Sequence, residues 1–403
     1  MKRQLISSAL ALSMIFGGAA ALPESITPQS GIVAQARSIR SGDFKYSLLK
    51  DGTAKIVGYN GKKTDVKIPS KIDGKKVTMI GKNAFYPKYS PNSDNIKSIT
   101  IPKGVTRIGF SAFSFCTNLK TVKIPSGVKK IESGAFYSCA NLKTIKIPSS
   151  VKTIGSVAFT GTKWLKAQQK KNPLVIVNGI LIDGTSSKGT VTIPKSVTKI
   201  ADRAFSGCTS LKAITIPKSV KEIGAGAFSD CTSLKAITIP KRVKEIGGWT
   251  FSGCASLKTI KIPSSVKTIG RGAFTGTKWL KAQQKKNPLV IVNGILIDGN
   301  ECKGNITIPK SVKTINDDAF GGNELFVNEN LKSVKIQSGV TSIGGMAFWG
   351  NVNLKTITIP KSVKEISPDA FLQCSYDKLI IKTPKGSAAA KLAKKIGIKV
   401  KYI

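Results

Sequence analysis

A period of 23 residues runs along this chain and limits what it can fold into. From Phe113 to Phe274, each Ala-Phe or Thr-Phe dipeptide follows the previous one after 23 residues, except for one step of 46. Self-similarity at a fixed period of about 20 to 50 residues is typical of solenoids, in which each unit packs only on its neighbours. We therefore predict one repeat array, although 403 residues would ordinarily form about two or three globular domains.

The array contains a duplicated block. The sequence LKTIKIPSSVKTIG begins at Leu142 and again at Leu257, and a longer identical stretch follows at Thr160–Gly184 and Thr275–Gly299. The offset is 115 residues, which is five periods, so both copies lie in phase with the repeat. We interpret the block as an internal duplication of five units, and its repetition as historical rather than functional.

Positions 1 to 23 are counted along the unit Leu119–Asn141, LKTVKIPSGVKKIESGAFYSCAN. Apolar and polar residues alternate over positions 3 to 6, which predicts a short strand with its apolar side inward. Proline at position 7 has no amide hydrogen and ends the pairing there. Positions 10 to 13 predict a second extended segment. The predicted fold class is a mostly β solenoid of right-handed coils.

Position 18 is phenylalanine throughout the array. An aromatic residue at one fixed phase predicts a spine in the core, and we favour this role over stacking on a ligand. The file comprises Phe85, Phe113, Phe136, Phe159, Phe205, Phe228, Phe251, Phe274, Phe320, Phe348 and Phe371.

Two coils have different contents, at Leu165–Ser187 and Leu280–Cys302. In the first, residues Trp164–Lys171 predict a helix, and LVIV and ILID predict the strands of a hairpin. Asn178-Gly179 between them suits a type I′ turn. The second variant coil repeats this pattern.

The pattern LxxIxIPxxVxxIGxxAFxxC resembles the BspA-like leucine-rich repeat of bacterial surface proteins. The likeness covers residues 63–376, with about 11 Ala-Phe units and 2 variant coils. Residues 37–62 resemble the N-terminal capping hairpin of such arrays, and residues 377–403 their C-terminal cap, a short helix and a strand. The resemblance implies a secreted or surface-exposed solenoid that binds other proteins or host material, with adhesion as the activity usually proposed.

The N-terminus predicts export. Residues 1–21 read as a signal peptide with a basic start, an apolar run at Leu5–Phe16 and a cleavage site after Ala21; an alternative cut follows Ala36. Residues 22–36 are then a linker. The apolar run is too short to span a membrane, and no later segment is long enough. We expect a bacterial protein that is secreted or held at the cell surface, without a transmembrane segment.

The charge of the chain favours anionic partners. The net charge is +43, and the basic residues are 57 lysines and 7 arginines. Arginine forms the bidentate fork that reads bases, whereas lysine is a flexible point charge. The excess therefore predicts diffuse attraction to wall polymers, glycosaminoglycans, sulfated mucin or extracellular DNA, and no sequence-specific recognition of nucleic acid.

Lysine recurs in phase at two positions of the repeat, 2 and 11. Equivalent residues on paired strands of neighbouring coils lie ~4.8 Å apart, inside the Debye length of ~8 Å at physiological salt. We predict continuous positive rails that bind polyanions; the alternative is a solvated face that keeps the array soluble. Position 2 holds Lys97, Lys120, Lys143, Lys212, Lys235, Lys258, Lys332 and Lys355, and position 11 holds Lys129, Lys152, Lys221, Lys244, Lys267, Lys313 and Lys364.

Two longer loops interrupt the register, at Tyr86–Asn95 and Gly321–Asn330. Insertions in a solenoid map to loops on one side, which is often the binding side. Tyr86, Tyr89 and Phe326 are therefore predicted to be exposed aromatic contacts for a protein partner.

The sequence predicts neither an enzyme nor a cofactor. Histidine is absent, which removes imidazole as a base or metal ligand. Without CxxC pairs the cysteines do not suggest zinc; we favour a buried file of reduced thiols over disulfides between coils. For the carboxylates we favour a charge-balancing patch over a glycosidase or calcium site. The cysteines are Cys116, Cys139, Cys208, Cys231, Cys254, Cys302 and Cys374, and the carboxylates are Asp298, Glu301, Asp317, Asp318, Glu324 and Glu329.

Overall fold

Each regular unit folds as one coil with two short strands, as its alternation predicts. The structure is a computed structural model that describes residues 38–321 and 329–403, so the predicted signal peptide, the linker and Phe326 lie outside the described residues. In the unit Leu119–Asn141, β9 (Thr121–Lys123) covers positions 3 to 5 and β10 (Lys130–Ile131) covers positions 12 and 13. Val122 and Ile131 are buried in the core, whereas the polar residues beside them face outward.

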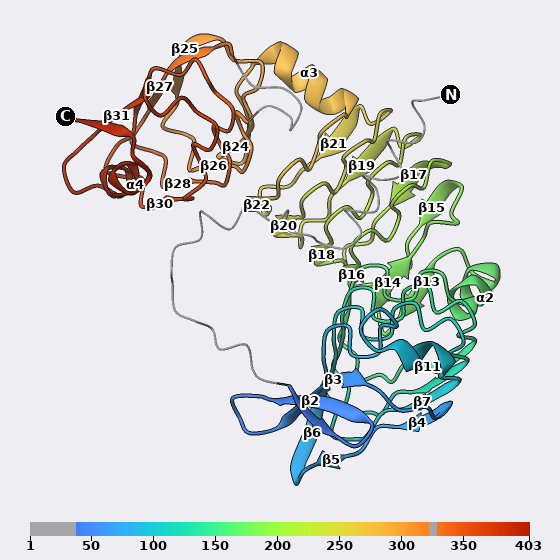
Figure 1. Ribbon diagram of the computed structural model, residues 1–403. Helices are drawn as coiled ribbons and strands as arrows, with labels where there is room; N and C mark the ends of the chain where they lie inside the picture. Colours follow the sequence, from blue (N-terminus) through green and yellow to red (C-terminus); the bar gives the residue numbers. More distant parts are fainter. Residues whose placement is uncertain (1–37, 322–328) are drawn as a thin grey trace, which may run out of the picture. The chain divides into compact units, whose positions relative to one another are not determined.

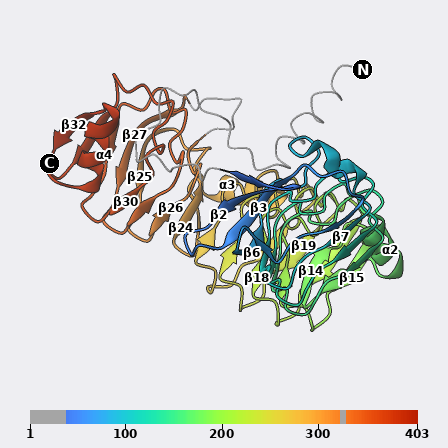
Figure 2. The same cartoon turned by 60° about the horizontal axis from the view of Figure 1, so that its bottom comes forward.

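The strands at positions 3 to 5, called first strands below, pair in parallel from coil to coil. Figures 1 and 2 show them side by side along the array. In the pair of β9 with β11, Val122 lies opposite Ile145, so equivalent positions are in register. The first strands are β4 (Asp65–Lys67), β7 (Ser98–Thr100), β9, β11 (Thr144–Lys146), β15 (Gly189–Thr192), β17 (Leu211–Thr215), β19 (Ala236–Thr238), β21 (Thr259–Lys261), β25 (Gly304–Ile308), β27 (Leu331–Ile336), β29 (Thr356–Thr358) and β31 (Ile380–Thr383).

The strands at positions 12 and 13, called second strands below, build separate parallel sheets in the same way. Their isoleucines at position 13 pair with one another, as Ile200 does with Ile223. The second strands are β6 (Lys75–Ile80), β8 (Arg107–Ile108), β10, β12 (Thr153–Ile154), β16 (Lys199–Ile200), β18 (Glu222–Ile223), β20 (Glu245–Ile246), β22 (Thr268–Ile269), β26 (Thr314–Ile315), β28 (Ser342–Ile343) and β30 (Glu365–Ile366).

Both variant coils contain the predicted helix and hairpin. Helix α2 (Lys163–Lys171) and strands β13 (Val175–Val177) and β14 (Ile180–Asp183) form the first; α3 (Lys278–Lys286), β23 (Val290–Val292) and β24 (Ile295–Asp298) form the second. Asn178 and Gly179 have φ values of 51° and 77°, which is the backbone of a type I′ turn. The hairpins join the second-strand sheets through β14 and β24, so the helices take the place of the missing first strands.

Additional elements lie at both ends of the array. Antiparallel strands β1 (Ile39–Ser41), β2 (Phe44–Leu48) and β3 (Ala54–Tyr59) precede it, and β3 pairs in parallel with β6. Strand β5 (Lys71–Ile72) pairs antiparallel with β6, and the 3₁₀ helix η2 (Pro91–Asn95) lies in the first long loop. At the C-terminal end, the predicted helix and strand are present as α4 (Ala388–Ile396) and β32 (Lys399–Tyr402).

The phenylalanine file is the spine of the core, as predicted, and all eleven rings are buried. Neighbouring rings stack within each run of regular coils; Phe205 and Phe228, for example, have centroids 5.1 Å apart. Each of the first two runs ends on the tryptophan of a variant helix: Trp164 lies 4.8 Å from Phe159, and Trp279 lies 4.7 Å from Phe274. The file is therefore a series of stacks separated by the variant coils.

The cysteines at position 21 are buried, unbonded thiols, which confirms the favoured interpretation. Their thiols donate hydrogen bonds to backbone carbonyls, as Cys139 Sγ does to the carbonyl oxygen of Phe113 on the preceding coil, at 2.9 Å. Threonine and asparagine also donate to backbone carbonyls at this position, the asparagine to the preceding coil and the threonine within its own coil. Thr162 Oγ1 donates to Phe159 O, and Asn351 Nδ2 donates to Phe320 O. Position 21 therefore requires a small buried donor, which explains why these three residue types replace one another.

Candidate functional site

The surface around the first strands, made of positions 2, 3 and 5 and called the first-strand face below, carries an ordered file of cations. All eight position-2 lysines are exposed. Their backbones bond directly from coil to coil: Lys120 N donates to Lys97 O at 2.8 Å, and Lys143 N donates to Lys120 O at 3.1 Å. The same bonds join Lys212, Lys235 and Lys258, and Lys332 with Lys355. Successive lysines of each run therefore occupy adjacent coils.

Lysines at position 5 widen this face. Lys123 and Lys146 are opposite each other in the pair of β9 with β11, and both are exposed. From Lys97 to Thr358, no coil has an aspartate or glutamate at positions 2 to 5 of the repeat. Asp65 in β4 is the one carboxylate at such a position among the first strands, and it accepts a hydrogen bond from Ser98 Oγ. Apart from Asp65, which lies beside Lys97 at one end, the first-strand face thus carries cations with no carboxylate at positions 2 to 5.

The position-11 lysines form a second exposed file, but their surroundings differ. Lys152 N donates to Lys129 O at 2.9 Å, and Lys267 N donates to Lys244 O at 2.8 Å, so this file is also continuous over neighbouring coils. Positions 12 to 16 beside it contain eight carboxylates: Glu132, Asp202, Glu222, Glu245, Asp317, Asp318, Glu365 and Asp369. We call this surface of positions 11 to 16 the second-strand face.

The ion pairs found among the described residues all belong to the second-strand face. Lys199 Nζ lies 2.6 Å from Glu222 Oε2, and Arg271 pairs with Asp318. Glu132 receives both Arg107 and Lys130. These four pairs use cations at positions 12 and 15, and none of them includes a position-11 lysine. The position-11 lysines therefore differ from those of the first-strand face in having carboxylates on the same surface. Sequence reasoning treated the two files alike, although the position of each carboxylate in the repeat would have separated them.

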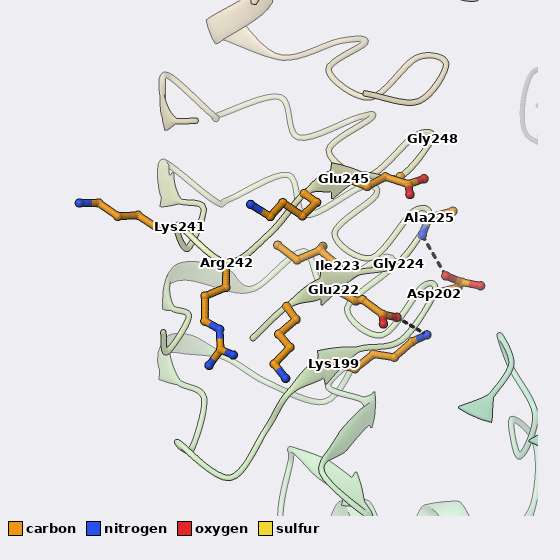
Figure 3. Close-up of a pocket in the computed structure, with 13 residues that line it drawn as sticks. Lys199, Asp202, Glu222, Ile223, Gly224, Ala225, Lys241, Arg242, Glu245 and Gly248 are labelled. Atoms are coloured by element: carbon orange, nitrogen blue, oxygen red, sulfur yellow. Dashed lines mark hydrogen bonds and ion pairs between the residues drawn. The ribbon is translucent and has the colours of Figure 1, made fainter. Parts of the chain in front are cut away.

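A groove of about 900 Å³ lies on the second-strand face over β16, β18 and β20 (Figure 3). Five basic and three acidic side chains line it. Figure 3 shows Lys199 directed toward Glu222, and Asp202 accepting from the amide of Ala225. Because three carboxylates line this groove beside its five cations, it attracts a polyanion less strongly than a face without carboxylates.

The aromatic residues of the first long loop differ in exposure. Tyr89 is 56% exposed, as predicted. Tyr86, also predicted to be exposed, is only partly so, because its ring stacks on Phe115 at 5.5 Å and contacts Tyr89 edge-on at 5.6 Å. Phe115 in turn meets Tyr137. These rings therefore form an outer aromatic row, and Tyr89 stands at its open end.

The carboxylates grouped in the sequence do not converge on one site. Asp298 accepts from Gln284, Asp317 accepts from the amide of Gly345, and Asp318 pairs with Arg271. Over residues 38–321 and 329–403, no group of three or more cysteine and carboxylate side chains is placed to hold a metal ion. In the same residues, none of the helices combines the length and apolar character needed to cross a bilayer.

Comparison with known proteins places this geometry in a family. Three solved structures are similar: a leucine-rich repeat protein of T. pallidum, with 28% identity, covering 62% of this chain and 95% of that chain (TM-score 0.29); a leucine rich cell surface protein of Faecalibacterium prausnitzii, with 28% identity, covering 89% and 97% (TM-score 0.32); and the pneumococcal vaccine antigen PcpA, with 18% identity, covering 91% and 99% (TM-score 0.31). No curated protein matches the chain. The model of the BspA type leucine rich repeat region matches in six copies over residues 78–174, 182–294 and 321–388, which is more than half of the sequence. The chain therefore belongs to the BspA-type leucine-rich repeat family.

Proposed function

We propose that this protein is a non-catalytic binding module that acts outside the bacterial cell and holds anionic polymers on its first-strand face. One observation carries the proposal: lysines at position 2 repeat on adjacent coils, some coils add a lysine at position 5, and no carboxylate occupies positions 2 to 5 from Lys97 to Thr358. Secretion or attachment to the cell surface is part of the proposal. The predicted signal peptide and the family membership support it.

The proposed ligand is a linear chain of sulfate or phosphate groups. Lysines on neighbouring coils lie ~4.8 Å apart, so their fields merge within the Debye length of ~8 Å. A flexible polymer with regularly spaced negative charges can follow such a row and release its condensed counterions. Lysine suits this kind of binding because its ammonium is a point charge that imposes no planar geometry on its partner. Glycosaminoglycans, wall polymers, sulfated mucin and extracellular DNA all belong to this class.

A second candidate is adhesion to host or matrix proteins through the aromatic row. Tyr89, which is 56% exposed at the end of that row, favours this possibility. A third is a passive scaffold held in the bacterium's own wall by the same lysines. Pull-downs from matrix extract and from isolated wall polymers, each at low and high salt, separate these candidates. A protein partner held by aromatic contacts survives high salt, whereas polymers held by lysine are released.

The main test is a salt titration with duplex DNA as a polyanion of known behaviour. For each neutralised phosphate, the slope of log K against log salt is about −0.9. Replacing Lys212, Lys235 and Lys258 by Gln is therefore expected to flatten the slope by roughly three such increments if every lysine contacts the polymer. The matched control replaces Lys221, Lys244 and Lys267 on the second-strand face, where carboxylates are close, and should change the slope less. Equal effects of the two triple variants, or binding indifferent to salt, would reject the first-strand face as the site.

A further inference from the structure

In each copy of the duplicated block, the run of first strands ends at a helix of the same sequence. In each variant coil, a helix replaces the first strand and carries four exposed lysines: Lys163, Lys166, Lys170 and Lys171 in α2, and Lys278, Lys281, Lys285 and Lys286 in α3. Both helices have the sequence KWLKAQQKK and contain no acidic residue. Lysines three, four and seven residues apart lie along one side of a helix. Each helix is therefore a row of cations.

Each helix is hydrogen-bonded to the last regular coil of its block. Trp164 N donates to Leu142 O at 2.7 Å, and Leu142 immediately precedes Lys143. Lys163 Nζ also donates to Asn141 Oδ1 at 2.7 Å. In the second copy, the backbone bond equivalent to Trp164–Leu142 joins Trp279 N to Leu257 O at 2.7 Å. The helical lysines thus continue the row that reaches Lys143 and Lys146 in one copy, and Lys258 and Lys261 in the other.

The helices are held firmly at both ends. Thr162 Oγ1 accepts from Leu165 N at 3.0 Å and caps the start of α2, while Trp164 packs against Phe159. At the other end, Gln169 Nε2 donates to Asp183 Oδ1 at 2.9 Å. The second copy has the same cap at Thr277 and the corresponding bond from Gln284 to Asp298. The two helices are therefore held alike, although Lys278 has Ser256 where Lys163 has Asn141.

We propose that each block ends in a complete cationic site of six lysines, two from the last first strand and four from the helix, and that the protein is consequently bivalent for linear polyanions. This inference rests on the proposed function and specifies its stoichiometry. The two sites are five coils apart, which is at least about 24 Å at the spacing of paired strands. One long polymer can therefore occupy both sites, or two polymers can be joined by one protein chain.

The copies differ near the helix in one charge. Three residues after the buried aspartate of the hairpin, the first copy has Ser186 and the second has Glu301. Both side chains are exposed. A carboxylate close to the cationic row weakens the attraction of a polyanion by direct repulsion. The site at α2 is therefore expected to bind more tightly than the site at α3, which offers a way to tell them apart.

The test is calorimetric titration at low salt with a size-fractionated heparin tetrasaccharide, a probe shorter than the separation of the two sites. We expect two molecules per wild-type chain. Replacing the four lysines of α2 by Gln should leave one, and replacing those of both helices should leave no tight site. Glutamine retains helix propensity, and circular dichroism checks that the fold is intact. The control variant carries Lys129, Lys152, Lys221 and Lys244→Gln on the second-strand face and should still bind two.

Long heparin tests bivalency itself. Linking two sites through one ligand raises the overall affinity by as much as roughly 10²–10⁴, so the α2 variant should bind long chains at least about tenfold more weakly, while the tetrasaccharide affinity at the remaining site is unchanged. A stoichiometry of one in the wild-type protein, or an α2 variant that still binds two tetrasaccharides, would overturn the inference and leave the proposed function standing. A wild-type protein that binds neither probe would overturn both.

Discussion

The burial of the phenylalanine spine predicts a large effect when Phe228 is replaced by alanine. Its ring is fully buried and stacks on Phe205 at 5.1 Å and on Phe251 at 5.6 Å. Phenylalanine-to-alanine substitutions in cores cost about 3–5 kcal/mol, including the cavity that remains. Each aromatic contact adds ~0.5–1.5 kcal/mol beyond burial, so a ring with two such neighbours belongs in the upper part of that range.

A ring at the end of a stack supplies the comparison. Phe371 is equally buried but stacks on Phe348 alone, at 5.6 Å. Phe371→Ala is therefore expected to cost about 1 kcal/mol less than Phe228→Ala. Urea unfolding followed by circular dichroism measures both, provided that the slope m is unchanged. If the file faced a ligand instead of the core, Phe228→Ala would change the free energy of unfolding by no more than about 0.5 kcal/mol, and that result would refute the reasoning.

Two further predictions concern buried titratable groups. Burial raises the pKa of the Cys139 thiol to about 12 and that of the Cys302 thiol to about 11. A maleimide should therefore modify few thiols in the native protein and about seven after denaturation without reductant. Fewer than three modified thiols after denaturation would indicate disulfides. Burial likewise raises the pKa of Asp183, despite its bonds from Gln169 and Thr185. Because the folded state holds this proton more tightly than the unfolded chain, the aspartate costs stability as pH rises from its ordinary value through its raised one. Asp183→Asn should remove that decline, so the stability difference between wild type and variant should widen with pH across this window and then level off; a difference that stays constant with pH would contradict it.

Most of the fold was predictable because each feature is decided within one coil. The alternation around Val122 places β9, the proline at position 7 ends it, and Asn178-Gly179 defines the turn of the hairpin. The recurrence of phenylalanine at position 18 predicted the core spine for the same reason, since a fixed phase in a stacked array leads to contact between neighbouring coils.

The features that were missed depend on contacts between coils. The sequence placed Tyr86 on the surface, but Phe115 has a φ of 61° and directs its ring beneath that of Tyr86. The difference between the two lysine files depends on carboxylates such as Glu222, which follows Lys221 and pairs with Lys199 on the neighbouring coil. The helical lysines were also overlooked, because their continuity with Lys143 rests on a backbone bond from Trp164 to Leu142 that no local pattern shows.

The tryptophans that end the phenylalanine stacks have a mechanical consequence. Where Trp164 and Trp279 cap a stack, the aromatic contacts of one block are completed before the next block begins. In an array stabilised by nearest neighbours, opening spreads along continuous contacts and halts where they are interrupted. The buried core itself is continuous from Tyr46 to Ile295 and divides only at the second variant coil, where a separate cluster begins at Leu296. Under a pulling force, such a protein would open first at that division, so one part could lengthen and absorb the load while the other kept its fold.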